Sequence, residues 1–363
     1  MKRLLAYAGI VIGLCILVAA TSSQITGDVH KLRAPGKEKE WWREHYSAWG
    51  DLTAMAYLDN IVKFREARSF TYGQPAGTCK NNLDLYLYGD SYVTDIPPHV
   101  YSYVDSFHFI FRYQQQQCRL DTGKRNVLII EVSERFLRAK FSDTSLYENI
   151  QVTQPIAGGI LTESTAENEQ HYASLLPSFK IADLFNPYIN QNLEYHLFNY
   201  EFLTAPRLMK AGLNYRLFNR ASGDVAISDD GQYLFLKRTV TPGHIYSCYG
   251  SISAGEINKI VASLNTIYKH YRDAGFDEVY LSIIPVPATI LQPANYNRQI
   301  PAVQNHPALQ MPVLDLYTVY KNHSSPQELY RAGDTHWNNN GMHEWLNLVN
   351  STLRTENSKI DRR

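Results

Sequence analysis

The sequence predicts an α/β fold built on a mainly parallel sheet, and three features of the chain support this prediction. Residues 126–132, NVLIIEV, form a near-continuous apolar run bounded by charge, which is typical of a strand buried on both faces. Residues 253–275 show the apolar spacing of an amphipathic helix, and the apolar segments 278–287 and 311–317 follow it. A helix followed by an apolar strand, repeated along the chain, implies parallel strands joined by helical crossovers.

The N-terminal segment is predicted to be either a membrane anchor or a secretory signal. Lys2 and Arg3 precede an uncharged run that extends from Leu4 to about Ser23. The run reaches the lower end of the ~20 residues that a spanning helix needs, and small residues near its end would also suit a cleavage site. We favour an uncleaved anchor within residues 1–26. In both cases the basic residues stay cytoplasmic and the rest of the chain is exported, either facing the periplasm from the inner membrane or secreted.

Composition divides the rest of the chain into a linker, a main domain and a tail. Residues 27–40 are polar and are expected to be a linker, and 356–363 are expected to be a polar tail. The main domain is placed at 41–355 and opens with a helical, aromatic-rich pattern over 41–68. Within it, residues 143–249 hold polar loops and scattered aromatic residues, and we expect an insertion there that shapes a substrate surface.

The most clearly predicted helix spans residues 253–275. Ser253 and Glu256 have the spacing of a capping box at its start, and Gly275 ends it. One face is expected to be buried, because apolar residues recur along it at helical spacing. These residues are Ile257, Ile260, Val261, Leu264, Ile267, Tyr268 and Tyr271.

Composition also argues against some classes of function. The 363 residues suffice for one large α/β domain with insertions or for two ordinary domains. Lys+Arg and Asp+Glu are both 35, and no basic cluster stands out, so we expect no nucleic-acid partner. The 26 tyrosines exceed what a core requires. Tyrosine is common where sugars or proteins bind, although packing at the edge of a core explains any single one more simply.

The cysteines point to neither a metal site nor a disulfide framework. Cys15 lies in the apolar run, which leaves Cys79, Cys118 and Cys248, so at most one internal disulfide can form among them and its pairing stays open. No CxxC or paired Cys/His spacing indicates structural zinc. We expect no metal ion and no organic cofactor.

A strand that ends on Gly-Asp-Ser is the first candidate for chemistry. The aromatic-rich run LDLYLYG, residues 83–89, is the first predicted strand, and Asp90 and Ser91 follow it directly. One explanation is a plain turn, since Gly, Asp and Ser are common turn residues. The other is a nucleophilic Ser91 presented at the carboxyl end of the strand, which then requires a general base.

The segment GDTHWNNNG near the C-terminus supplies such a base. Asp334 and His336 stand two residues apart, just before a helix predicted to begin near Asn339 or Asn340. A hydrolytic serine needs a histidine to accept its proton, and the histidine needs a carboxylate to fix its tautomer. Taken singly, Asp334 is better explained as a turn or helix-cap carboxylate, and His336 as a histidine in a surface loop. Together they favour catalysis at the carboxyl edge of the sheet, where open α/β folds place their sites.

Three segments resemble the SGNH (GDSL-type) hydrolase superfamily. YGDSY resembles its first block, and GDTHWNNNG resembles the Asp-x-His-Trp block of its envelope branch, which includes alginate O-acetyltransferase-like proteins. LIIEVSERFL, residues 128–137, resembles a further block of that branch. The resemblance implies a three-layer α/β/α, flavodoxin-like fold. It also implies Ser91 as nucleophile, His336 as base and Asp334 as the residue that orients it.

The oxyanion site departs from the pattern of this superfamily, because the Asn-bearing block is missing and SER stands in its place. The amide of Ser91 is one expected donor, and Arg135 is a second, although Arg135 would equally suit an ion pair with Glu131 or Glu134. Two further residues are assigned to the oxyanion or substrate site. They are Asp90 and Trp337, the latter either stacking on a sugar ring or wedging its loop.

The expected function is transfer of an acyl group, by preference acetyl, to or from hydroxyls of a cell-envelope or exported polysaccharide. Ser91 would take the acyl group, and His336 would then activate a sugar hydroxyl or water. The partners are therefore an envelope glycan, an acyl donor and the membrane that holds the N-terminal helix. The resemblance also implies a multispanning, acyl-exporting membrane protein. The alternatives are a polysaccharide acetyl esterase and a non-catalytic glycan-binding protein.

Overall fold

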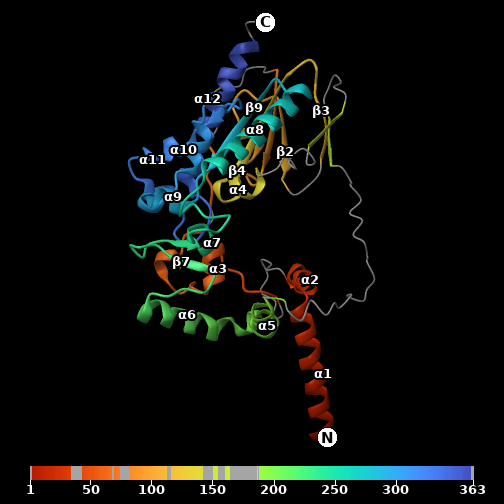
Figure 1. Cartoon of the computed structure of the whole chain (residues 1–363), viewed down its shortest axis with the longest axis vertical. Coiled ribbons are helices and arrows are strands. Elements are labelled where there is room, and N and C mark those ends of the chain that lie inside the picture. The colour runs from red at the N-terminus through yellow and green to blue at the C-terminus, as the bar shows by residue number, and fades with distance from the viewer. Residues whose placement is uncertain are drawn as a thin grey trace.

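The fold is taken from a computed structural model, in which a body of strands and helices stands on one protruding N-terminal helix (Figure 1). The structure describes residues 2–33, 43–67, 69–73, 82–112, 116–141, 150–153, 160–163, 186 and 188–360. Its longer helices are α1 (Lys2–Thr21), α2 (Ser23–Arg33), α5 (Ile189–Phe198), α6 (Thr204–Phe218), α8 (Ala254–Asp273) and α12 (Asn339–Ile360). The shorter ones are α3 (Asp51–Ala56), α4 (Leu137–Lys140), α7 (Lys237–Val240), α9 (Pro287–Leu291), α10 (Gln299–Gln304) and α11 (Leu316–Lys321).

The central sheet has the strand order of a doubly wound fold. Its five parallel strands are β1 (Leu83–Gly89), β2 (Ser106–Phe111), β4 (Arg125–Ser133), β9 (Glu278–Ile284) and β10 (Val313–Leu314). They lie in the order β10-β9-β4-β1-β2, which is the flavodoxin-like order 2-1-3-4-5 when these strands are counted along the chain. The order reverses between β1 and β4. Ligands bind at such a switch point, outside the carboxyl ends of the strands, and Ser91 lies there.

Helices cover both faces of this sheet, so the predicted α/β class with a mainly parallel sheet is confirmed. Tyr86 and Leu128 belong to a core that includes the buried face of α8, which Figure 1 shows lying across the sheet. Leu85 and Ile129, on the opposite face, belong to a second core that includes the buried face of α12. Because successive residues of a strand point to opposite faces, β1 and β4 are buried along their whole length.

The amphipathic helix and its cap form as the sequence predicts. Ser253 caps α8, its hydroxyl accepting from the backbone of Glu256, while the Glu256 carboxylate accepts from the backbone of Ser253. Gly275 follows the helix with φ 111, a conformation that other residues rarely adopt. The chain then enters β9, which lies between β10 and β4.

The described part of residues 143–249 adds no strand to the central sheet. Two of its strands, β5 (Ile150–Thr153) and β6 (Ile160–Glu163), pair with β3 (Gln116–Arg119) in a separate sheet. Two more, β7 (Val225–Ile227) and β8 (Leu234–Leu236), form a hairpin. Phe235 and Cys248 of this segment pack in the core on the α8 side of the central sheet.

The long helical pattern predicted over residues 41–68 is wrong for most of its described part. The helix α3 ends after six residues, where Tyr57 adopts a left-handed conformation with φ 53, and one short 3₁₀ turn follows at Val62–Phe64. The apolar residues that suggest one long helix instead pack with the β7–β8 hairpin into a small separate core. Its members include Leu52, Leu58, Phe64, Leu234 and Leu236.

The linker predicted at residues 27–40 is also partly wrong. Residues 27–33 form the second half of α2, and 34–40 lie outside the described residues. Specific contacts hold the polar side chains of this helix. His30 Nδ1 lies 2.7 Å from a Glu44 carboxylate oxygen, and the Arg33 guanidinium lies 3.9 Å from the centre of the Tyr200 ring. The sequence of this segment resembles that of a solvated linker, because the contacts that hold its polar side chains come from residues distant in the chain.

The polar tail predicted from residue 356 begins too early, because α12 continues to Ile360 and Glu356 is fully buried. The Glu356 carboxylate accepts from Arg125 Nε at 2.6 Å and from the Tyr280 hydroxyl at 2.7 Å. Burial raises the pKa of this carboxyl, but hydrogen bonds from Lys359, Tyr280 and Arg125 outweigh that effect and lower it. The last turn of α12 is therefore tied to the start of β4.

Glu356→Ala is expected to lower the free energy of unfolding by about 3 kcal/mol, because it removes the nearer carboxylate from the buried Arg125 guanidinium and leaves only Asp277, at 3.6 Å, to balance that charge. Lys359→Ala is the matched control. It removes a half-exposed partner of the same carboxylate and should change stability by less than about 0.5 kcal/mol. Urea unfolding measures the free energy of unfolding of both variants. If both lose little and lose it equally, residues 356–363 behave as the polar tail that the sequence predicts.

Candidate active site

Ser91 and His336, 245 positions apart in the chain, lie within hydrogen-bond distance in the fold. Ser91 Oγ is 2.9 Å from His336 Nε2. Ser91 follows β1 in a turn in which the backbone amides of Val93 and Thr94 both donate to the Asp90 carbonyl oxygen. Its side chain is half-buried, so a substrate can reach the hydroxyl. The Gly-Asp-Ser segment therefore forms a turn and also presents the serine.

Asp334 orients the imidazole from its other side. His336 Nδ1 lies 2.7 Å from Asp334 Oδ1, which also accepts from the His336 backbone amide at 2.9 Å. Because a carboxylate only accepts, the proton belongs on Nδ1, and Nε2 can accept from the Ser91 hydroxyl. The second oxygen, Asp334 Oδ2, forms an ion pair with Arg331 at 2.5 Å.

Asp334 is held in its charged form. Burial alone would raise its pKa, but the hydrogen bond from His336 and the charges of His336 and Arg331 outweigh burial and lower the pKa to about 2. A carboxylate that stays ionised at neutral pH can stabilise the imidazolium that forms when His336 takes a proton.

The loop that carries Asp334 and His336 is fixed by aromatic packing and by a close backbone approach. The Tyr92 hydroxyl donates to the Thr335 carbonyl oxygen at 2.5 Å, and its ring lies over the His336 ring at 4.6 Å. Gly333 accepts at its carbonyl from the Thr53 amide at 3.0 Å. A Cβ at Gly333 would lie 2.1 Å from Thr53 Oγ1, so only glycine allows this approach.

Trp337 lies inside the fold, which favours a wedge over sugar stacking. Its side chain is 0% exposed, so a sugar ring cannot reach its face. It packs edge-to-face on Tyr92 at 5.1 Å and lies 5.8 Å from Trp345 of α12. The assignment of Trp337 to substrate binding is therefore corrected: this residue holds the loop in place.

Asp51 belongs to the same cluster, although nothing in the sequence pointed to it. Its carboxylate accepts from the Thr335 backbone amide at 2.8 Å and from the Thr335 hydroxyl. The ligand atoms of Asp51, Asp334 and His336 lie within 4.8 Å of one another. Burial and the charge of Asp334 raise the pKa of Asp51. A single Asp at the start of a short helix gives no signal by spacing, because its partners lie more than 280 positions away.

The cluster is better explained by hydrogen bonds than by a bound metal ion. Three oxygen and nitrogen ligands at this spacing could also surround a cation. The Arg331 guanidinium already pairs with Asp334, however, and the Thr335 hydroxyl donates to Asp51. A cation between these groups would lie beside the Arg331 charge and would compete with the proton on His336 Nδ1.

Asp90 serves the turn and a buried charge network rather than an open substrate site. It is 3% exposed, accepts from the Tyr92 amide at 3.1 Å and pairs with Arg112 at 2.9 Å. Its own amide donates to the Glu131 carboxylate at 2.8 Å. Gly89 makes this possible, because a Cβ there would lie 2.9 Å from the same carboxylate and closer still to Val93. The assignment of Asp90 to substrate contact is corrected to a positioning role.

Glu131→Gln is expected to stabilise the protein increasingly as the pH rises. Burial, followed by the charge of Asp90, raises the pKa of Glu131 well above its usual range. The wild type therefore loses stability between the unfolded pKa of ~4.3 and the raised folded pKa, whereas Gln does not titrate. Urea unfolding across this range should show the stability difference growing and then levelling off.

Glu256→Gln is the control with the opposite sign. The hydrogen bond from Arg138, above all, lowers the pKa of Glu256, so its charged form favours folding above the unfolded pKa. Removing that charge should therefore destabilise the protein more at higher pH. Parallel curves for the two variants would contradict the assignment of a raised pKa to Glu131.

Arg135 makes neither of the ion pairs that its position in the sequence allows. Glu134 is satisfied by other donors, namely the Val286 amide, the Thr289 hydroxyl and the Gln299 amide group. Among the described residues, no partner accepts from the buried Arg135 Nε. Arg135 lines a small cavity together with Thr335. Burial raises the pKa of Tyr92, and the positive charge of Arg135 opposes that shift.

The two remaining cysteines within the described residues are both buried. Burial, as the largest cause, raises the pKa of the Cys118 thiol and of the Cys248 thiol. Cys79 lies outside the described residues. Neither described thiol is poised as a nucleophile, since the thiolate is the reactive form.

Comparisons of the chain with protein-family models, with curated proteins and with solved structures give no match. The assignment of a function therefore depends on the geometry of this site and on the sequence blocks that carry it.

Proposed function

We propose that this protein transfers an acyl group, by preference acetyl, to hydroxyls of a cell-envelope or exported polysaccharide. The observation that carries the proposal is the chain of contacts from Ser91 Oγ to His336 Nε2 at 2.9 Å and from His336 Nδ1 to Asp334 at 2.7 Å. A serine, a histidine and a carboxylate in this arrangement are the parts of a Ser-His-Asp acyl-transfer site.

In the first step, Ser91 Oγ attacks the carbonyl carbon of the donor ester and His336 Nε2 takes the hydroxyl proton. The carbonyl oxygen becomes an oxyanion. When the tetrahedral intermediate collapses, the bond to the leaving oxygen breaks and His336 returns the proton to that oxygen. The product is an acyl ester on Ser91, and Asp334 stabilises the imidazolium while it exists.

In the second step, a sugar hydroxyl takes the place of the leaving group. His336 accepts its proton, the sugar oxygen attacks the acyl carbon, and the bond to Ser91 Oγ breaks as the serine regains a proton. Water would give hydrolysis by the same route. We favour transfer because α1 is long and apolar enough to cross a membrane, and an anchored enzyme can meet a donor delivered there.

Arg135 is proposed to stabilise the oxyanion together with the Ser91 amide. Arg135→Ala is expected to lower kcat by about 10²-fold, the usual loss for one oxyanion-stabilising group. Arg135→Lys should recover part of the rate, because it retains the charge. Arg138→Ala is the matched control, since Arg138 pairs with Glu256 and lies on the next helix. Equal rates for Arg135→Ala and wild type would remove Arg135 from the mechanism.

The proposal is tested with the full-length chain in detergent or vesicles, using p-nitrophenyl acetate as donor and a soluble glycan as acceptor. Wild type should release p-nitrophenol, acetylate the glycan and release the phenol faster as the glycan is raised. Ser91→Ala should neither release p-nitrophenol nor acetylate the glycan. The control Ser351→Ala, on the exposed face of α12, should match wild type. Release that ignores the glycan would instead indicate an esterase, and release unchanged in Ser91→Ala would exclude the serine mechanism.

A further inference from the structure

An apolar row on α6 is exposed to solvent. Met209, Leu213 and Leu217 are 64%, 52% and 68% exposed. Their four-residue spacing places them in one row along the helix. The opposite side of α6 faces the body, where Thr204 and Gly212 are buried. Exposed apolar side chains that gather on one helix face mark an interaction surface.

Basic side chains flank this row on both sides. At about 100° per residue, Lys210 and Arg216 lie about 60° to either side of Leu213. Both are exposed, and neither has an ion pair among the residues that the structure describes. An apolar centre with cations at its edges is the pattern of a helix that lies in a membrane interface, with the cationic ends reaching the phosphates.

The position of α6 relative to α1 identifies what covers the row. The end of α1 is held by α5 and by a residue just before it. The side chains of Asn192, in α5, and of Asn186 donate to the carbonyl oxygens of Ala20 and Thr21, each at 2.8 Å. Figure 1 shows α5 and α6 lying across the end of the body from which α1 extends. A bilayer that contains α1 would therefore reach its surface near Thr21, at the level of α5 and α6.

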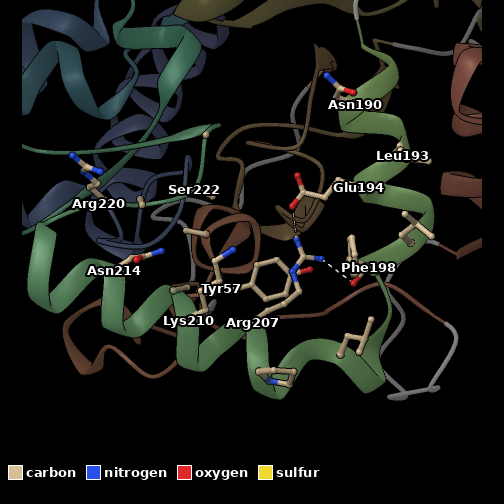
Figure 2. A pocket seen from close by; sticks show the side chains of 17 residues that line it. Tyr57, Asn190, Leu193, Glu194, Phe198, Arg207, Lys210, Asn214, Arg220 and Ser222 are labelled. Atoms are coloured by element: carbon tan, nitrogen blue, oxygen red, sulfur yellow. Dashed lines mark hydrogen bonds and ion pairs between the residues drawn. The ribbon is translucent and has the colours of Figure 1, made fainter.

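The hollow between α5 and α6 fits the same environment. It has a volume of about 830 Å³, and its walls combine apolar residues such as Leu193 and Leu197 with the side chain of Lys210. Figure 2 shows α6 along one side of the hollow and α5 along another, with the Arg207 ion pair to Glu194 between them. The Arg207 guanidinium also lies 4.1 Å from the centre of the Tyr57 ring, so the floor of the hollow is already fixed.

We infer that the exposed face of α6 rests in the headgroup region of the bilayer that α1 spans, with Met209, Leu213 and Leu217 inserted and Lys210 and Arg216 at the lipid phosphates. This inference rests on the proposed anchoring by α1 and is independent of acyl transfer. A second attachment would fix the body against the membrane instead of leaving it on a single pivot at Thr21. It would also give the site a constant orientation toward a donor in the membrane.

Spin-label depth measurement on the full-length chain tests the inference. In a background with Cys15 and Cys79 replaced, single cysteines are placed at Met209, Leu213 and, as an aqueous control, Val62, which is 76% exposed. The protein is reconstituted at high dilution in vesicles that contain phosphatidylcholine and phosphatidylglycerol. Labels at Met209→Cys and Leu213→Cys should lie about 5–10 Å below the phosphates, and Val62→Cys should be aqueous.

A label at Val11→Cys, in the middle of α1, separates the possible failures. If Val11→Cys is in the hydrocarbon and the α6 labels are aqueous, the docking of α6 is wrong while the anchor stands. If Val11→Cys is also aqueous, the anchor itself is wrong. Labels on α6 that neither oxygen nor a polar relaxation agent can reach would mean that protein covers the row, which also overturns the inference.

Discussion

Ser91→Ala and His336→Ala are each expected to lower kcat/KM for an acyl ester by at least about 10³-fold, and the double variant should be no slower than either one alone. The reason is that the two side chains act as one unit through the 2.9 Å contact. Removing the base leaves the hydroxyl without a proton acceptor, and removing the hydroxyl leaves the base without a role. Steady-state rates of the four proteins measure the coupling directly.

Stability must be checked in the same experiment, because His336 is largely buried and packs on Tyr92. His336→Gln serves as a second variant that preserves most of the volume and cannot act as a base. Losses that multiply in the double variant would show that Ser91 and His336 act separately. A rate that survives in His336→Gln would mean that another group takes the proton.

Asp334→Asn is expected to lower kcat by about 10³–10⁴-fold, because an amide no longer fixes the proton on His336 Nδ1 and no longer stabilises the imidazolium. Rates of Asp334→Asn measured beside its urea unfolding curve separate this loss of catalysis from a simple loss of folded protein.

Asp51→Asn provides the graded comparison for that experiment. Asp51 contacts Thr335 and not the imidazole, so we expect a loss of about tenfold, or about 1.4 kcal/mol of transition-state stabilisation. A rate equal to that of wild type would show that Asp51 only supports the loop. A loss as large as that of Asp334→Asn would mean that Asp51 matters to the imidazole as much as Asp334 does.

The parts of the fold that the sequence predicts well are those in which local pattern and burial agree. Residues 126–132 form a near-continuous apolar run because β4 lies at the centre of the sheet, and α8 carries both its cap and its buried face in one contiguous segment. The pattern over 41–68 misleads because its apolar residues pack on the β7–β8 hairpin, over 150 positions away. Glu356 misleads for the same reason, since its partner Arg125 is distant in the chain.

The residues of the candidate site also fall into those that the sequence predicts and those that only the fold reveals. Ser91, Asp334 and His336 carry a spacing that the sequence displays, and the fold brings them into contact. Asp51 and Arg331 show no recognisable spacing in the sequence. Isolated charged residues are common, and only tertiary contacts distinguish these two. Trp337 shows a further limit: its place beside His336 suggests a binding role, yet side-chain direction, which spacing alone does not reveal, points it into the core.

Mass spectrometry of the wild-type chain, quenched soon after mixing with an acyl ester and then digested, identifies the residue that carries the acyl group. We expect one acyl group, on the peptide that contains Ser91, and its loss when a hydroxyl acceptor is added before quenching. We also expect that His336→Gln acquires the group far more slowly. Turnover of the ester without acylation of Ser91, or an acyl group on another residue that forms at the same rate in His336→Gln, would contradict the serine mechanism.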